Sequence, residues 1–160
     1  MNISEKLKEN QEILDAYEKS HSLPELKPPG TEEELQEYLS MERDIIEKLP
    51  PEKIWPICVR LSQYSFYLQR SINRSKSIIT FANNEINKIV ANEINQYDKF
   101  TKHDVKVFQI CKTNVAAAEL IKIKLYAEQL VDRFMDLSSG VKNISYILSM
   151  GYKNKVGDRE

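Results

Sequence analysis

Glycine, proline and cysteine are scarce in this sequence, and each shortage excludes a class of protein. Four glycines and six prolines in 160 residues are too few for a β-sandwich or barrel, which needs a turn every few residues. The two cysteines, Cys58 and Cys111, have no metal-ligand spacing and fit a reducing compartment. The composition therefore predicts an all-α protein rather than a secreted, disulfide-linked one.

Long apolar runs and catalytic motifs are missing as well. No stretch approaches the roughly 18 apolar residues of a transmembrane helix, and acids occupy the N-terminus where a signal peptide has its apolar segment. The two histidines, His21 and His103, lie far apart, and there is no glycine-rich phosphate loop, HExxH, CxxC or nucleophile elbow. We therefore expect a cytoplasmic protein that contacts no membrane, is not an enzyme, and has no catalytic residues, metal site or cofactor.

Charge is distributed unevenly along the chain, although the net charge is only −1. Residues 1–50 hold 6 Lys or Arg and 13 Asp or Glu, whereas residues 51–160 hold 17 and 11. One explanation is chance clustering on solvated helix faces. The other is an acidic arm joined to a basic body that binds a polyanion, in which the arm either restrains that binding or meets a basic protein partner.

The acidic arm divides into two predicted helices. Residues 1–19 form a short amphipathic helix, and residues 20–30 form a linker because three prolines and a glycine forbid a helix there. A second acidic helix spans residues 31–49, where Thr31 and Glu34 have the spacing of a capping box. Both helices are short and weakly apolar, so we expect them to rest on the body or on a partner.

The body, residues 51–152, is predicted to be a long antiparallel helical hairpin, followed by a tail at 153–160. Two helices, separated by a polar break at residues 95–99 and a new start at Thr101, each carry apolar or small residues at steps of 3 and 4. We call these rows the seam. In the first helix the seam is Ile57, Leu61, Tyr64, Leu68, Ile72, Ser75, Ile79, Ala82, Ile86 and Ile89. In the second it is Ala116, Leu120, Ile123, Ala127, Leu130, Phe134, Leu137, Val141, Ile144 and Leu148. Because one hairpin leaves part of each helix uncovered, we expect a homo-oligomer closed through the second row.

Cations and aromatic residues follow another face of the first long helix. This basic stripe consists of Arg60, Gln63, Tyr67, Arg70, Arg74, Ser77 and Phe81, with Lys76 close by. No acid occurs between Glu52 and Glu85, so sequence neighbours do not pair with these cations. Cations track phosphates and aromatic faces accept any base, which suits single-stranded nucleic acid. Alternatively, Tyr67 and Phe81 pack in an oligomer interface and the arginines pair with acids of a neighbouring copy.

A second basic cluster surrounds the predicted turn between the long helices. It comprises Lys99, Lys102, Lys106 and Lys112, with Asp104 in opposition. This cluster is the competing location for a nucleic-acid site.

The stretch 64–152 resembles a known family. Tyr64-Ser65-x-x-Leu68 opens a long basic helix, a polar break follows, and the second helix closes on Ser145-Tyr146-Ile147-Leu148-Ser149-Met150-Gly151. This order is similar to that of the UvsY-like bacteriophage recombination mediator family. The resemblance implies a ring-shaped, all-helical homo-oligomer in the bacterial host cytoplasm. Such a mediator binds single-stranded DNA, loosens the single-strand-binding protein and loads the phage recombinase.

The chain departs from that family at its short basic motif, Lys-x-Arg followed by an apolar residue. Here the corresponding segment is Lys88-Ile89-Val90-Ala91, so only Lys88 carries over. The resulting DNA-binding hypothesis comprises phosphate contacts from Arg60, Arg70 and Arg74, assistance from Lys76 and Lys88, and base stacking on Tyr67. The alternative function is a non-enzymatic coiled-coil structural or adaptor protein, for example a virion scaffold, that binds no nucleic acid.

Overall fold

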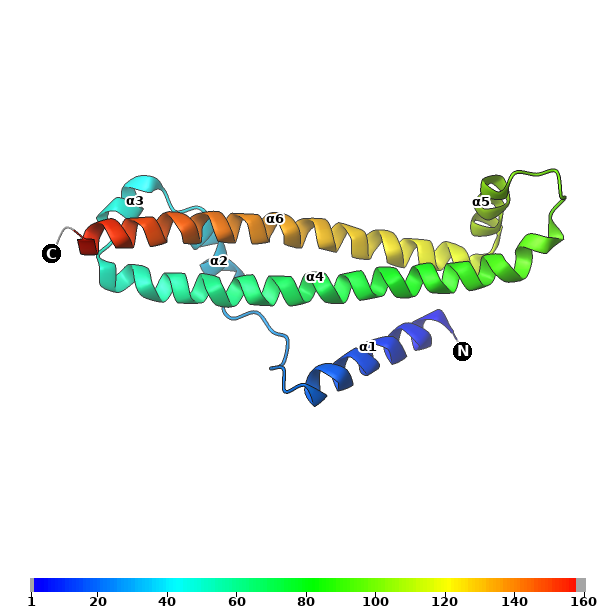
Figure 1. Ribbon diagram of the computed structural model, residues 1–160, viewed down its shortest axis with the longest axis horizontal. Helices are drawn as coiled ribbons and strands as arrows, with labels where there is room; N and C mark the ends of the chain where they lie inside the picture. The colour runs from blue at the N-terminus through cyan, green and yellow to red at the C-terminus, as the bar shows by residue number, and fades with distance from the viewer. Residues whose placement is uncertain (1, 158–160) are drawn as a thin grey trace. The chain divides into compact units, whose positions relative to one another are not determined.

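The computed structural model describes residues 2–157, and every regular element in that range is a helix. In chain order the elements are α1 (Ile3–Ser20), α2 (Glu32–Leu39), α3 (Arg43–Lys48), α4 (Pro51–Glu93), the 3₁₀ turn η1 (Ile94–Gln96), α5 (His103–Thr113) and α6 (Val115–Gly157) (Figure 1). The prediction of an all-α fold is confirmed. None of these described helices combines the length and apolar content needed to cross a bilayer.

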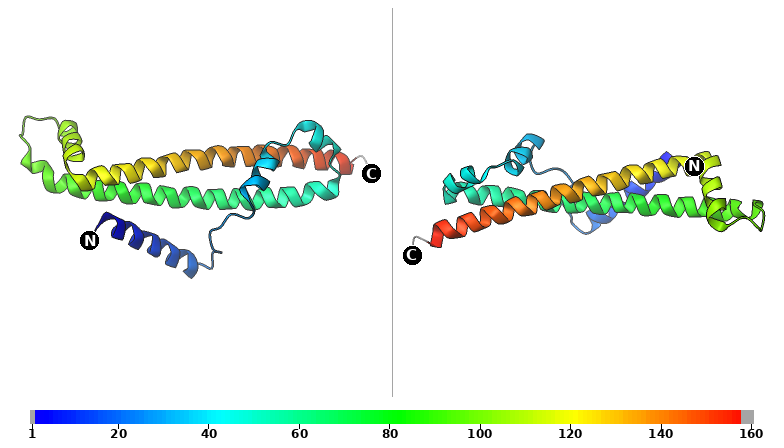
Figure 2. Two further views of the ribbon diagram at one scale, coloured as in Figure 1. Left: turned by 180° about the vertical axis from the view of Figure 1, so that it is seen from behind. Right: turned by 90° about the horizontal axis from the view of Figure 1, so that it is seen from above.

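The chain divides into two compact units, and each contains part of both long helices. The first unit comprises the chain up to Glu25 together with Asn73–Val131, so it holds α1, η1, α5 and one part each of α4 and α6. The second comprises Leu26–Ile72 and the chain from Asp132 onward, with α2, α3 and the remaining parts of α4 and α6. Within each unit, the segments of α4 and α6 lie side by side in every view (Figure 2).

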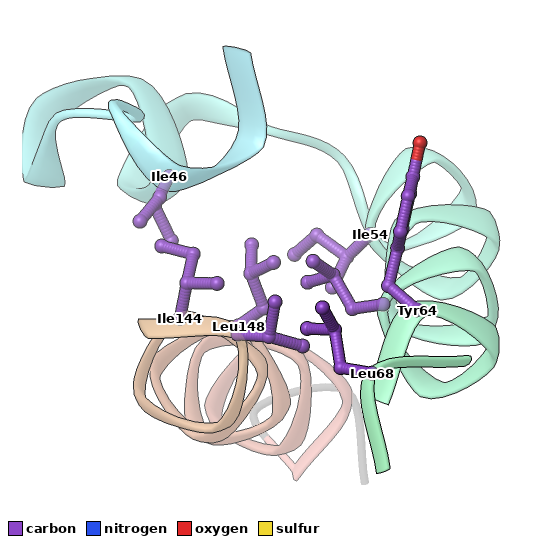
Figure 3. Packing of buried hydrophobic residues seen from close by; sticks show 8 residues of the cluster. Ile46, Ile54, Tyr64, Leu68, Ile144 and Leu148 are labelled. Carbon is purple, nitrogen blue, oxygen red and sulfur yellow. The ribbon is translucent and has the colours of Figure 1, made fainter. Parts of the chain in front are cut away.

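The core of the second unit accounts for much of the apolar periodicity in the sequence. It is built from Ile46 of α3, from Ile54, Leu61, Tyr64 and Leu68 of α4, and from Val141, Ile144 and Leu148 of α6 (Figure 3). Leu61 and Leu148 are completely buried, which stabilises the fold by about 1.5–3 kcal/mol for each side chain. The seam in this unit is therefore already covered by residues of the same chain.

The single helix expected over residues 31–49 is wrong, because two helices occupy that segment. At the end of α2, the backbone N–H of Ser40 donates to the carbonyl of Gln36, and its hydroxyl donates to the carbonyl of Glu37. The backbone is then extended at Glu42, before α3 begins. This bend turns the apolar side of α3 inward, so that Ile46 is only 4% exposed. The gain from burying Ile46 explains why the chain does not continue as one straight acidic helix.

A second difference from the expected hairpin lies between the two long helices. Thr101 does not begin one continuous helix; α5 begins after Lys102, and Asn114 separates it from α6. The backbone of Asn114 is extended, and its side-chain oxygen accepts a hydrogen bond from the N–H of Ala117 at 3.0 Å. Its amide nitrogen donates to Glu93. Asparagine is a strong N-cap residue, so Asn114 ends one helix and begins the next.

The seam in α6 keeps the predicted register at its buried positions Leu120, Ala127, Val141, Ile144 and Leu148, and departs from it locally. Leu137 is predicted to be buried but is 36% exposed, whereas its neighbour Ser138 is 6% exposed. Ala117, rather than Ala116, is fully buried in the first unit. A straight helix with 3.6 residues per turn drifts out of a strict heptad, which moves the buried positions. The helix also continues through Gly157, so residues 153–157 of the predicted tail are helical; residues 158–160 lie outside the described residues.

Candidate nucleic-acid interface

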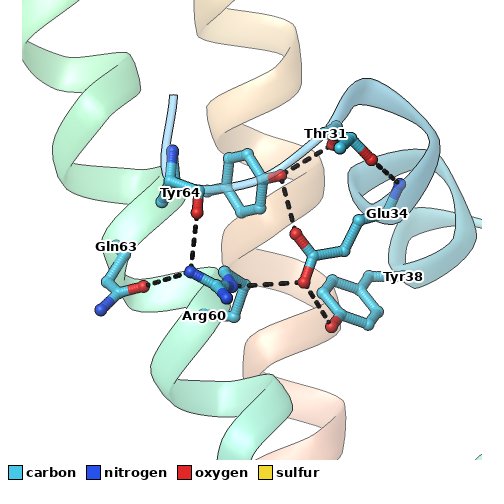
Figure 4. A network of polar contacts seen from close by, with 7 residues as sticks. Thr31, Glu34, Tyr38, Arg60, Gln63 and Tyr64 are labelled. Atoms are coloured by element: carbon cyan, nitrogen blue, oxygen red, sulfur yellow. Dashed lines mark hydrogen bonds and ion pairs between the residues drawn. The ribbon is translucent and has the colours of Figure 1, made fainter. Parts of the chain in front are cut away.

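In the second unit, Arg60 of the basic stripe is engaged by the acidic arm. Its Nε donates to Oε1 of Glu34 at 3.2 Å, and its Nη1 donates to the carbonyl of Pro29 at 2.7 Å and to Gln63 at 3.1 Å (Figure 4). Glu34 lies one turn into α2, where Thr31 caps the helix by accepting the N–H of Glu34. The Glu34 carboxylate points to α4 rather than completing the expected capping box, so it neutralises a cation 26 residues away.

The Glu34 carboxylate also accepts hydrogen bonds from two tyrosine hydroxyls. Tyr38 donates to Glu34 Oε1 at 2.9 Å, while the Tyr64 hydroxyl lies 3.2 Å from Oε2 and 2.8 Å from the carbonyl of Thr31. Burial, followed by the proximity of the Glu34 carboxylate, raises the pKa of Tyr64, and burial together with the hydrogen bond to Glu34 raises the pKa of Tyr38. A Cβ at position 30 would lie 1.7 Å from Oε2 of Glu34, so a larger residue there would require this carboxylate to move. The network therefore holds α2 and its linker against α4.

In the first unit, α1 engages Arg74 in the same manner. Nε of Arg74 donates to Oε1 of Glu18 at 3.2 Å and Nη2 donates to Oε2 at 2.8 Å, and Nη2 also pairs with Asp15. The hydrogen bonding of the Arg74 guanidinium to the Glu18 carboxylate is the main reason that the pKa of Arg74 is raised. The Arg74 side chain retains 30% of its exposure. One guanidinium is thus shared by two carboxylates of the acidic arm.

Lys88, the residue suggested by the family resemblance, also has a carboxylate partner. Its Nζ donates to Oε1 of Glu85 at 2.5 Å, and Lys6 of α1 donates to the other oxygen at 2.6 Å. These two hydrogen bonds, from Lys6 first and Lys88 second, lower the pKa of Glu85. Lys88 remains 70% exposed, so only part of its charge is directed toward the protein.

The other stripe residues occupy different environments. Tyr67 is half-buried, packs against the core and lines a cleft of about 750 Å³ beside α2, so its ring is not an open stacking platform. Arg70 is half-buried, and Lys76 is exposed with no ion pair to a described residue. Within the described chain, Arg60 and Arg74 form no ion pair with an acid nearby in the sequence, as the sequence predicts, but each is paired with carboxylates distant in the chain. Their partners come from the arm rather than from nearby sequence.

The cluster around α5 is open by comparison. We define the turn patch as Lys99, Phe100, Lys102, Lys106, Phe108 and Lys112, all in the first unit. Phe100 is 94% exposed and Phe108 67% exposed. None of the four lysines forms an ion pair with another residue of the described chain. Asp98 accepts the backbone N–H of Phe100, and Asp104 lies beside His103. Two phenylalanines and three lysines of this short segment are therefore exposed to solvent, while Lys106 is half-buried.

The lysines of the turn patch were visible in the sequence, but its aromatic members were not recognised. Phe100 and Phe108 alternate with those lysines along residues 99–112, and that interleaving is the signal that could have identified them. Their exposure could not be read from the sequence, because Phe is buried in most helices. Within residues 2–157, no group of three or more His, Cys, Asp or Glu side chains is placed to hold a metal ion.

No protein-family model, curated protein or solved structure matches this chain. The functional interpretation consequently depends on the residues and their geometry.

Proposed function

We propose that this protein is a non-enzymatic helical protein that binds single-stranded nucleic acid, with the turn patch as the first surface to make contact. The observation that carries this proposal is the solvent exposure of Phe100 and Phe108 among four lysines. Exposing two phenylalanines is unfavourable in water, and such patches are typical of binding surfaces. Bases can stack on the rings while the ammonium groups contact phosphates, without any requirement for a base sequence.

A more specific proposal is phage-type recombination mediation. It draws its support from the resemblance of residues 64–152 to that family, which would make single-stranded DNA the ligand and the recombinase and single-strand-binding protein the partners. We also propose that α4 and α6 form one continuous antiparallel hairpin and that the protein is a homo-oligomer.

Self-association through the seam has little support, because the seam is largely covered within each unit. An apolar row on α4 is a better candidate. Trp55, Val59 and Phe66 are 63%, 42% and 56% exposed, and their spacing of 4 and 7 places them on one helix face. The same row supports the second candidate function, a structural or adaptor protein that binds other helices.

Binding of labelled oligonucleotides, measured by fluorescence anisotropy at low and moderate salt, tests the proposed function. We expect binding to single strands of any sequence that weakens steeply as salt rises. Lys102→Ala with Lys106→Ala should reduce the salt slope, by about 0.7 for each lost phosphate contact. Phe100→Ala should weaken binding by about fivefold or more, since losing one stacked base costs about 1–3 kcal/mol.

The matched control replaces two exposed lysines of α6, Lys122→Ala with Lys142→Ala, which removes the same charge away from the turn patch. Equal effects of the two double variants would refute the assignment to the turn patch. If the double variant Arg70→Ala, Arg74→Ala abolishes binding and the turn-patch variants do not, the basic stripe is the site. Absence of binding at either salt would favour the adaptor.

A further inference from the structure

We propose, building on the function above, that Arg74 belongs to a second phosphate-binding site that α1 keeps closed, so that α1 is a built-in competitor of nucleic acid. Arg74 and the turn patch belong to the same unit. The proposal assigns the acidic helix a role in regulating the same binding activity.

The carboxylates of α1 contact Arg74 in the way that a phosphate would. Glu18 accepts two hydrogen bonds, one on each carboxylate oxygen, from Nε at 3.2 Å and Nη2 at 2.8 Å, and Asp15 adds a second anion at Nη2. Two-pronged recognition of this kind is common to carboxylates and phosphates, because both present paired oxygens to the planar guanidinium. A phosphodiester and the Glu18 carboxylate would therefore compete for the same donors.

The attachment of α1 is weak enough for such competition. No residue of α1 is buried, and Ile13 and Tyr17 are 62% and 60% exposed. Asn10 is only partly exposed, and the nitrogen atom of its side-chain amide is shielded from solvent without a hydrogen-bond partner among the described residues, which opposes attachment. The polar anchors of α1 include the Arg74 pairs and the contact from Lys6 to Glu85, and partly exposed ion pairs are individually weak and screened by salt.

Only α1 would detach from the body when nucleic acid binds, whereas α2 and α3 would stay in place. In the second unit, α3 contributes Ile46 to the core, and Leu35 and Leu39 of α2 pack against it, so the part of the arm that neutralises Arg60 is held by apolar burial. Residues 23–28, which connect α1 to that part, have no regular structure and can change conformation without breaking helical hydrogen bonds. A strand bound at the turn patch would raise the local phosphate concentration and displace α1 from Arg74.

The test compares two pairs of substitutions that remove the same charge from α1. Asp15→Asn with Glu18→Gln breaks the contacts to Arg74, whereas Glu9→Gln with Glu12→Gln changes two exposed acids of the same helix. We expect the first pair to tighten binding of a labelled single-stranded oligonucleotide about five- to tenfold, since the fraction of protein with an open site rises. The control pair should change it by less than about twofold. Adding Arg74→Ala should abolish the gain.

A covalent tether provides a second readout. In a background of Cys58→Ser and Cys111→Ser, Lys6→Cys with Glu85→Cys allows α1 to be linked to α4 by a short bismaleimide. The linked protein should bind less tightly than the same protein before linking, because α1 then stays over Arg74.

The possible outcomes separate this inference from the proposed function. Equal affinity for the two pairs of acid substitutions, with a wild-type protein that binds DNA, would overturn the inference and leave the function standing. No binding by the wild type or by either pair would overturn both. Binding by the Asp15→Asn, Glu18→Gln variant alone would support the inference, since it would show a nucleic-acid site that α1 closes, but it would refute the turn patch as the first surface to make contact.

Discussion

Tyr64→Phe tests the network that joins α2 to α4. The substitution removes one hydroxyl from a side chain that is 2% exposed and keeps the ring in the core. The lost group lies 2.8 Å from the Thr31 carbonyl and 3.2 Å from the Glu34 carboxylate. Glu34 keeps its contacts from Arg60 and Tyr38, so it is not left alone. We therefore expect a loss of about 1–2 kcal/mol in the free energy of unfolding, between the values for neutral and charged hydrogen bonds.

Urea denaturation followed by the fluorescence of Trp55 measures this loss, since Trp55 is the one tryptophan of the sequence and belongs to the same unit. For a typical urea dependence, the midpoint should fall by about 0.5–1 M. Tyr146→Phe is the matched control: this ring is 68% exposed, and the change should cost less than about 0.5 kcal/mol. Equal midpoints for the two variants would refute the reasoning.

The pH dependence of the same variant provides a further check. Because the pKa of Tyr64 is raised in the folded protein, its neutral form contributes stability that is fully present below the unfolded pKa of about 10. That stability is lost as the pH rises through the higher folded value. Tyr64→Phe should therefore lose less stability than the wild type between neutral and strongly alkaline pH, and an unchanged alkaline loss would contradict the assignment.

Two further predictions concern the arm and the assembly. Hydrogen bonds from Lys6 and then Lys88 lower the pKa of Glu85. The ionised carboxylate therefore contributes stability that is present above the unfolded pKa of about 4.3 and is lost as the pH falls through the lower pKa of the folded protein. Hydrogen exchange should therefore show α1 loosening below about pH 4, and Glu85→Gln should make it equally loose at pH 7; unchanged protection in that variant would contradict the role of this pair. Light scattering at micromolar concentration should give a mass above the 18.7 kDa of one chain, and Phe66→Asp should lower it if the apolar row of α4 is the interface. A monomer at that concentration would refute self-association.

The fold class and the long helices could be predicted because their signals are local. Scarcity of turn residues and the steps of 3 and 4 predict amphipathic helices, and α4 and α6 lie where that pattern is strongest. The bend between α2 and α3 cannot be read from the sequence because its cause is the burial of Ile46 in a core shared with α4 and α6. The α6 residues of that core, Ile144 and Leu148, lie about 100 positions further along the chain. The separate α5 cannot be read from the sequence because an asparagine also occurs on the surface of a continuous helix. Only its hydrogen bonds to Ala117 and Glu93 identify Asn114 as the N-cap of a new helix.

The candidate site shows the same division. The sequence by itself determined that residues 1–50 are acidic, that the body is basic, and that no sequence neighbour can pair with Arg60 or Arg74. Only the tertiary structure decided that Glu34 and Glu18 cover those arginines while Phe100 and Phe108 remain in solvent. The physical reason is range: charge composition and helical periodicity are properties of short segments, whereas an ion pair between residues 56 positions apart depends on how the chain folds back.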